Sequence, residues 1–231
     1  RDRRAGVLQH TLPTAFPAKC GGWGAAPTAG LHFPPGMVGA MRGRGFDVAE
    51  GTLHVGAGAF LPVKDEDAAQ HPMHTEHFEI RRDTVRQLLA KWGAVTAVGT
   101  TSVRTLESLA ALAWRIHATG SPDADRVIGQ WELYDIPADY TGRTALGELL
   151  GWMEREGEER LKAATQIMIT PLGYTFRIVR NIITNFHQPK STLLLLVSAY
   201  VGDDWRRIYD YALGHDFRFL SYGDSSLLMR D

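Results

Sequence analysis

The stretch AVTAVGTTSVRTLESLAALA, residues 94–113, decides the fold class. Its first five residues are apolar or β-branched and stop at Gly99, which predicts a strand over Ala94–Val98. Apolar residues then follow at helical spacing, at Val103, Leu106, Leu109, Ala110 and Ala113. A strand, a glycine turn and a helix in this order are typical of an α/β fold.

The upstream sequence extends this alternation. Asp83–Trp92 has helical spacing, and the residues around Thr52–Val55 alternate as in a strand before Gly56 and Gly58. Residues 1–24 contain no clear period and predict loop or extended structure.

The downstream sequence predicts further elements. Ala145–Ala164 is charged and predicts a solvated amphipathic helix. Thr165–Thr170 and Tyr174–Ile183 predict two strands, which a Pro-Leu-Gly turn would join as a hairpin. The segment from Leu193 to Leu228 predicts a strand or helix, then a helix, then a strand. We therefore expect an α/β protein of mixed, α+β character.

Composition excludes several classes of protein. The chain has 231 residues, 44% of them hydrophobic, which supports a folded core and argues against disorder. Its net charge of -1 gives no overall attraction to nucleic acid, so any RNA contact must be local. A single cysteine, Cys20, excludes an internal disulfide framework. No apolar run is long enough to span a bilayer, and we expect a cytoplasmic monomer that does not bind membranes.

A histidine-rich segment contains His71, His74 and His77 beside Glu76. Three such histidines could ligate a metal if they shared one helix face, but Pro72 disfavours a regular helix here. We expect no metal site, and interpret His74 with Glu76 as a hydrogen-bonding or acid–base pair.

Polar clusters after apolar runs are the candidates for chemistry. At Thr100, Thr101 and Ser102 the hydroxyls stand where a helix begins, and with Arg104 they could hold a carboxylate or phosphate. The alternative is that the hydroxyls cap the helix while Arg104 pairs with Glu107 or faces solvent.

Single histidines in glycine- or asparagine-containing loops form a second group, namely His32, His54 and His187. Desolvation in such loops can bring an imidazole into a useful pKa range, although one such histidine is more often structural. Asp224 is either a turn former or a catalytic carboxylate. Basic candidates for RNA contact include Arg177 and Lys190.

Longer motifs resemble a known family. They are AAPTAGLHF (25–33), TLHVGAGAFLPV (52–63), HPMHTE (71–76), VGTTSVRTLES (98–108), ITNFHQPKSTLLLLVSAY (183–200) and FLSYGDSSLL (219–228). Together they closely resemble the S-adenosylmethionine:tRNA ribosyltransferase-isomerase family, collinearly from about Ala25 to Leu228. Ala59 and Gln188 stand where that family usually has Thr and Leu.

The resemblance implies that S-adenosylmethionine is a substrate rather than a methyl donor. Its ribosyl group would be transferred to 7-aminomethyl-7-deazaguanine at the wobble position of tRNA and isomerised, giving epoxyqueuosine-tRNA with release of adenine and methionine. Such a path needs a base, an acid for adenine and an anchor for methionine.

The resemblance also suggests roles for residues. His32 or His54 would be the base or acid, and Asp224 or His187 the second proton-transfer or adenine-binding group. The Thr100–Arg104 loop would hold the methionine carboxylate. The expected contacts with S-adenosylmethionine are Thr28, Gly30, Thr100, Thr101, Ser102, Arg104, Asn185 and Tyr222, and those with tRNA are Arg177 and Lys190.

The domain organisation follows from the same comparison. Residues 1–24 would be the remnant of a truncated region, and residues 25–231 the main α/β catalytic domain, with an inserted segment at about 123–164. The family's small β-barrel domain would be largely missing. An alternative function is a catalytically incomplete fragment that binds RNA. A conventional methyltransferase is a third, but the expected glycine-rich loop is not apparent.

Overall fold

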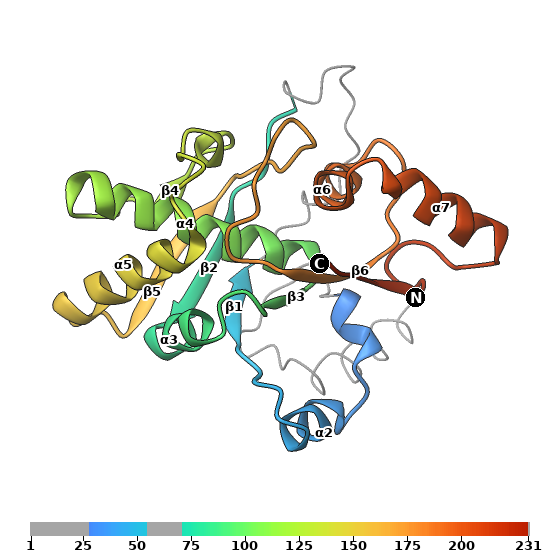
Figure 1. The fold of residues 1–231 in the computed structure, drawn as a ribbon, viewed down its shortest axis with the longest axis horizontal. Helices are drawn as coiled ribbons and strands as arrows, with labels where there is room; N and C mark the ends of the chain where they lie inside the picture. The colour runs from blue at the N-terminus through green and yellow to red at the C-terminus, as the bar shows by residue number, and fades with distance from the viewer. Residues whose placement is uncertain (1–27, 55–70, 231) are drawn as a thin grey trace, which may run out of the picture.

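The computed structural model describes residues 28–54 and 71–230 and has two β-sheets with helices packed between and around them (Figure 1). This is the mixed α/β architecture predicted from the sequence. The predicted elements around residues 52–55, 83–92, 94–98 and 100 onward are all present, with ends that differ by a few residues.

The first sheet has four strands in the order β1-β2-β5-β4. The strands are β1 (Gly51–His54), β2 (Glu76–Arg81), β5 (Arg160–Thr165) and β4 (Val127–Ile128). β2 pairs antiparallel with both β1 and β5, while β4 runs parallel to β5. Along β2, Glu76, Phe78 and Ile80 are buried and alternate with more exposed residues, as expected for a sheet with one face against the core.

The second sheet has three strands in the order β3-β6-β7. β3 (Thr96–Val98) is parallel to β6 (Asn181–Asn185), and β7 (Ser225–Leu228) is antiparallel to β6. Because β7 runs antiparallel, its first residue Ser225 lies opposite the last residue of β6, Asn185. The residues just after β6 and just before β7 therefore lie at the same end of this sheet.

Helix α4 (Thr100–Thr119) connects the two sheets. It contacts β3 and β6 of the second sheet and β4 and β5 of the first, and it packs along α5 (Gly142–Arg155), which also contacts α3 (Arg82–Ala90). Fully buried apolar residues at this junction include Val103, Leu109, Leu112, Leu146 and Leu149. Helices α6 (Thr192–Val201) and α7 (Asp204–Gly214) pack together beside the second sheet (Figure 1).

The remaining elements are short. The 3₁₀ helix η1 (Thr28–His32) contacts β6, whereas α2 (Met37–Gly43) has no buried residue. A second 3₁₀ helix, η4 (Glu132–Tyr134), contacts α4. In the part of the chain that the structure describes, no helix is both long and apolar enough to cross a membrane.

The predicted helix over Ala145–Ala164 is wrong in its second half. α5 ends at Arg155, and Gly157 has a positive φ of 68°, after which the chain extends as β5. The buried residues Leu161 and Ala163 alternate with exposed Lys162, which is the period of a strand. The charged composition of the whole stretch concealed this change of period.

The predicted hairpin of Thr165–Thr170 with Tyr174–Ile183 is also wrong. β5 ends at Thr165 and β6 begins at Asn181, and the two strands belong to different sheets. The backbone amides of Arg177, Ile178 and Val179 donate instead to the buried carboxylate of Glu107, at 2.8–2.9 Å. Because these donors are satisfied by a side chain, this segment needs no strand partner.

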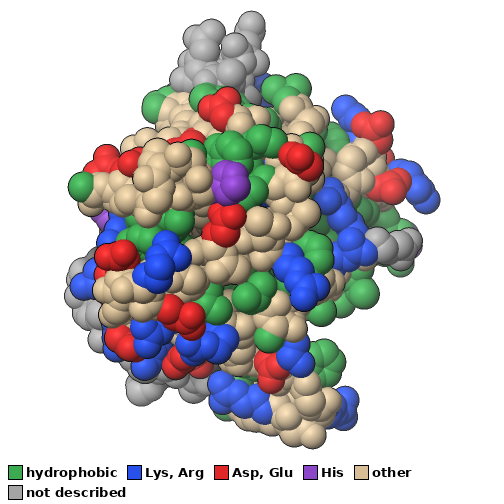
Figure 2. Space-filling model, turned by 60° about the vertical axis from the view of Figure 1, so that its left-hand side comes forward, with side chains coloured by type: hydrophobic (Ala, Val, Ile, Leu, Met, Phe, Trp, Pro, Cys, Tyr) green, Lys and Arg blue, Asp and Glu red, His purple; other side chains and the backbone are tan. Residues whose placement is uncertain are grey.

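Charged side chains of both signs are interspersed over the face shown in Figure 2. Ion pairs among the described residues include the exposed pair of Arg86 with Glu154. Mixed signs of this kind favour a solvated surface over a polyanion-binding one.

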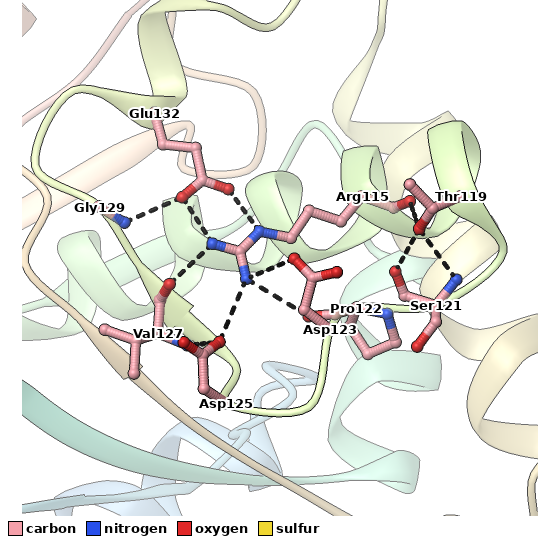
Figure 3. A network of polar contacts seen from close by, with 9 residues as sticks. All are labelled: Arg115, Thr119, Ser121, Pro122, Asp123, Asp125, Val127, Gly129 and Glu132. Carbon is pink, nitrogen blue, oxygen red and sulfur yellow. Dashed lines mark hydrogen bonds and ion pairs between the residues drawn. The ribbon is translucent and has the colours of Figure 1, made fainter.

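The segment after α4 is held by Arg115 (Figure 3). Its guanidinium donates to both carboxylate oxygens of Glu132, at 2.6 and 2.7 Å, and to the carbonyl of Val127 at 2.7 Å. Asp123 lies 3.3 Å away. The side chain of Arg115 thus links β4 and η4 to α4.

Residues 123–164, which the sequence predicts to be an inserted segment, supply β4, α5 and most of β5. Since β5 lies between β2 and β4, these residues complete the first sheet and its helical cover.

Candidate functional site

The candidate site lies where η1, the turn before α4, the end of β6 and the start of β7 meet. The amide of Gly99 donates to the carbonyl of Ile183 on β6 at 2.8 Å. Gly99 has a φ of 92°, and a Cβ placed there would lie 3.7 Å from the Cβ of Ala29 in η1. Four motifs that are far apart in the sequence therefore converge at one end of the second sheet.

His32, Asn185 and Gly223 form the centre of this site. The Nδ2 atom of Asn185 lies 3.2 Å from Nε2 of His32 and donates to the carbonyl oxygen of Gly223 at 3.4 Å. Asn185 is 2% exposed, and its Oδ1 has no partner among the described residues. A buried amide thus joins η1 to the loop before β7.

An open surface cavity of about 450 Å³ lies beside these residues. Its lining consists of His32, His215, Asp216, Phe217, Asp224 and Ser225. One wall comes from η1, one from the end of α7 and one from the start of β7. The lining combines imidazole, carboxylate, hydroxyl and aromatic groups, a mixture suited to a polar ligand that carries a flat ring.

Asp224 is held by Arg218. Its Oδ2 accepts from the Arg218 amide at 2.7 Å, and its Oδ1 accepts from the Arg218 guanidinium at 3.2 Å. These bonds hold the pKa of Asp224 below its usual value. The carboxylate facing the cavity is therefore ionised at neutral pH.

The loop between Arg218 and Asp224 is held closed by tight backbone contacts between its two ends. The Asp224 amide donates to the Arg218 carbonyl at 2.7 Å. A Cβ on Gly223 would lie 2.2 Å from that same carbonyl oxygen, so no other residue fits without moving the backbone. The loop carries Tyr222, a residue that is 68% exposed.

His187 lies just beyond β6. Its Nε2 is 2.8 Å from the Thr184 hydroxyl, and its backbone amide donates a hydrogen bond to the Tyr209 hydroxyl at 3.0 Å. Burial lowers the pKa of His187 to about 4. A histidine with this pKa is neutral at pH 7, and His187, which is half-buried, is not among the residues that line the cavity.

The start of α4 brings Thr100, Thr101 and Ser102 to the same end of the sheet. The predicted side-chain cap is not formed: Gly99 is the N-cap residue and no side chain bonds there. The Ser102 hydroxyl donates instead to the carbonyl of Val98 at 2.7 Å. The first-turn amides of a helix are free of intrahelical bonds, so they remain available to an anion.

Arg104 points away from this turn. It is buried, its Nη1 lies 2.8 Å from Oε1 of Glu76, and its Nε donates to the carbonyl of Ile167 at 3.1 Å. Burial lowers the pKa of Arg104, while the Glu76 carboxylate opposes this shift. Nη2 of Arg104 and Oε2 of Glu76 have no hydrogen-bond partner among the described residues, so within those residues the carboxylate that Arg104 contacts is that of Glu76.

Two other predicted residues have different surroundings from those expected. Arg177 is buried, and its guanidinium donates to backbone carbonyls of Ile136, Pro137, Tyr140 and Thr175, so this placement does not suit a contact with RNA. His54 is exposed on β1 of the first sheet, opposite His77. It is therefore not part of the cluster around Asn185.

The other predicted contacts are distributed around the site. Thr28 and Gly30 belong to η1, where Gly30 is buried, and Lys190 is exposed in the turn before α6 with a φ of 56°. Within residues 28–54 and 71–230, no group of three or more His, Cys, Asp or Glu residues could hold a metal ion.

Sequence reasoning missed the wall formed by His215, Asp216 and Phe217. The ring of His215 stacks on Tyr211, with centroids 3.9 Å apart, and its Nδ1 lies 2.7 Å from the Tyr211 carbonyl. The signal in the sequence was a histidine and an aspartate directly after a helix, which is common at solvent-exposed helix ends. Nothing in that pattern indicated which cavity the turn would line.

Comparisons with known proteins match most of the chain. Residues 9–228 match the family described as queuosine biosynthesis protein. The chain is 41% identical over 210 residues to the S-adenosylmethionine:tRNA ribosyltransferase-isomerase of Burkholderia mallei, which covers 89% of this chain and 48% of that protein. It is 40% identical to the protein of the same name from Herminiimonas arsenicoxydans, over 99% of this chain and 55% of that protein.

A solved structure has a similar fold. The S-adenosylmethionine tRNA ribosyltransferase of Thermotoga maritima matches with a TM-score of 0.54 and 28% identity, over 87% of this chain and 51% of that chain. The present chain thus spans about half the length of the relatives it matches.

Proposed function

Because the chain belongs to the queuosine biosynthesis protein family, we propose that it is the S-adenosylmethionine-binding part of an S-adenosylmethionine:tRNA ribosyltransferase-isomerase. In the proposed reaction the ribosyl group of S-adenosylmethionine is transferred to 7-aminomethyl-7-deazaguanine at the wobble position of tRNA and isomerised. The product is epoxyqueuosine-tRNA, and adenine and methionine are released. The observation that carries this proposal is the convergence of His32, Asn185 and Asp224, from three of the resembling motifs, beside one cavity.

The cavity walls suit the small-molecule substrate. Asp224 is an ionised acceptor, and S-adenosylmethionine carries a sulfonium and an ammonium group that such an acceptor attracts. Phe217 offers an apolar ring surface for the adenine or ribose. His32 also lines the cavity and could supply a polar contact.

The methionine carboxylate is proposed to bind at the start of α4. The amides of Thr100, Thr101 and Ser102 are at a helix N-terminus, where the partial positive charge favours an anion. Arg104 is not assigned this role, because its Nη1 pairs with the buried carboxylate of Glu76. The helix dipole and the backbone amides would therefore hold the carboxylate without a cationic side chain.

Lys190 is the proposed contact with tRNA. It is exposed in the turn directly after the Asn185–His187 motif, so a phosphate bound there would lie near the same end of the second sheet. A tRNA substrate also agrees with the expected cytoplasmic location. His187 is proposed to keep the end of β6 in place as a neutral side chain.

Release of adenine is the direct test. The chain is incubated with S-adenosylmethionine and tRNA bearing 7-aminomethyl-7-deazaguanine, with the full-length Burkholderia mallei relative as positive control. We expect adenine and methionine in equal amounts, and a loss of at least about 100-fold in turnover for Asp224→Ala, as for the removal of an electrostatic partner of a transition state.

A control variant and the identity of the product distinguish the proposed reaction from its alternatives. His54→Ala tests the histidine that lies on the other sheet, and we expect it to retain turnover near that of the unaltered chain. Formation of S-adenosylhomocysteine would indicate a methyltransferase. Binding of tRNA with no adenine release, while the positive control is active, would favour the RNA-binding alternative.

A further inference from the structure

We propose that Asn185 is a positioning residue that holds neutral His32 as the tautomer protonated at Nδ1, so that His32 offers the ligand a hydrogen-bond donor and not a base. This assignment concerns the protein's own groups, and only the identity of the ligand rests on the proposed function. It chooses between the two roles, base or acid, that the sequence left open for His32.

The orientation of the Asn185 amide follows from Gly223. A carbonyl oxygen can only accept, so the Asn185 atom that lies 3.4 Å from the Gly223 oxygen must be the NH₂ group. The reverse orientation would place two oxygens against each other in a buried site. The two hydrogens of Nδ2 then suffice for two acceptors, Gly223 and the His32 ring.

The protonation of His32 follows from that orientation. Its Nε2 lies 3.2 Å from the Asn185 Nδ2, and because Nδ2 is the donor, Nε2 must accept. In a neutral imidazole the other nitrogen then carries the hydrogen. Nδ1 has no hydrogen-bond partner among the residues that the structure describes, so its N–H is the group that a ligand in the cavity can use.

The position of Asn185 supports a role in orientation over one in stability. Its side chain is almost fully buried, yet its Oδ1 lacks a partner within the described ranges, which is unfavourable for folding. The amide nevertheless bridges η1 to the Arg218–Asp224 loop, the two parts that bring His32 and Asp224 to the cavity. With a donor from His32 and an acceptor from Asp224, the cavity fits a ligand group that has both an acceptor and a donor, such as the edge of an adenine ring or an amino-acid end.

Imidazole nitrogen NMR measures the tautomer directly and does not require activity. Protein labelled with ¹⁵N is studied at a pH where the histidines are neutral, and the His32 signals are assigned by their disappearance in His32→Gln. We expect the Nδ1-protonated form in the unaltered protein. In Asn185→Asp the side chain can only accept, and we expect the hydrogen to move to Nε2. In Asn185→Ala both tautomers become populated.

The matched control is Asn181→Ala. Asn181 lies at the other end of β6 and donates to the Thr96 hydroxyl at 3.2 Å, so its removal deletes the same amide from the same strand without touching His32. The His32 signals should then be unchanged, and backbone spectra check that each variant is folded.

Two results would overturn the proposal. They are an Nε2-protonated His32 in the unaltered protein and a tautomer that stays the same in folded Asn185→Asp. A His32 Nδ1 signal that does not move when S-adenosylmethionine is added in excess would instead contradict S-adenosylmethionine as the ligand of this site. If the tautomer behaves as expected while no adenine is released, the positioning role stands and the proposed reaction fails.

Discussion

Glu107 is fully buried, and its carboxylate accepts three backbone amides and the Tyr174 hydroxyl. The side chain therefore replaces a strand partner for the segment before β6. Burial and the adjacent Glu107 carboxylate raise the pKa of Tyr174 well above its usual value, so the hydroxyl remains a donor at ordinary pH.

Replacing this carboxylate tests its importance for stability. In Glu107→Gln one acceptor oxygen becomes an NH₂ group that faces backbone donors, so we expect the free energy of unfolding to fall by about 2–4 kcal/mol. Urea denaturation measures the change. The control is Glu154→Gln, an exposed partner of Arg86, for which we expect less than about 1 kcal/mol. Equal effects in both variants would contradict a special role for Glu107.

The low pKa of His187 predicts that the free energy of unfolding depends on pH. Its pKa is about 4 in the folded protein, whereas an unfolded histidine has a pKa of about 6.5. Between these values the unfolded chain binds more protons, so stability is complete above about pH 6.5 and falls as the pH drops toward 4. Allowing for partial solvent contact of the ring, we expect His187 to account for about 2 kcal/mol.

Denaturation at pH 7 and at pH 4.5 measures this contribution. The loss between the two values should be smaller in His187→Gln than in the unaltered protein. His77→Gln, an exposed histidine on β2, serves as the control and should retain the full loss. An unchanged pH dependence in His187→Gln would show that other groups cause it.

Several candidate residues could be selected from the sequence, but their surroundings could not. His32, Asn185 and Asp224 stand in polar clusters that follow or end apolar runs, and the structure brings them to one site. Arg104 and Arg177 stand in equally polar motifs, yet both guanidinium groups are turned inward. Spacing along the chain does not indicate which carboxylate or carbonyl will lie beside a long side chain.

At the scale of the elements, the conformation of the Arg218–Asp224 loop depends on one residue, Gly223. A Cβ on Gly223 would lie within 2.6 Å of three backbone atoms of Arg218 and Phe219. Gly223→Ala should therefore displace the loop that carries Asp224 and part of the cavity wall. We expect the affinity for S-adenosylmethionine to fall at least about 10-fold, equivalent to 1.4 kcal/mol.

Calorimetry of S-adenosylmethionine binding measures this effect. The control is Gly214→Ala at the end of α7, where a Cβ meets nothing within 4 Å. That variant should bind as the unaltered protein does. Unchanged affinity in a folded Gly223→Ala variant would show that the loop does not shape the ligand site.

The elements that sequence patterns predicted well are those with a clear local period. α3, β3 and the start of α4 follow directly from alternating and helical spacing. The boundary between α5 and β5 was missed because charged residues continue through both elements. The hairpin was predicted wrongly because two apolar runs joined by a turn look alike whether they pair with each other or belong to separate sheets.

At the scale of the whole molecule, charge limits how RNA can be bound. The net charge is -1, and both signs are interspersed on the face in Figure 2. A proposed tRNA contact must therefore be local. Lys190→Gln should weaken tRNA binding and reduce the slope of log affinity against log salt concentration by about 1, the value for one lost phosphate contact.

Binding measured across a series of salt concentrations tests this prediction. Lys162→Gln is the matched control, since Lys162 is an exposed lysine on β5 of the other sheet. Its slope should equal that of the unaltered protein. Equal slopes in all three proteins would remove Lys190 from the RNA interface.

The sequence by itself determined the fold class, most of the local elements, the resemblance to a family, and the motifs in which the candidate residues lie. These properties depend on local periodicity and on residue types in order along the chain. The tertiary structure decided which motifs share a cavity, that His215 belongs to it, that Arg104 and Arg177 are buried, and that β5 and β6 belong to different sheets. The physical reason is that such choices depend on which distant group satisfies each buried donor and acceptor, and that is settled only when the whole chain packs.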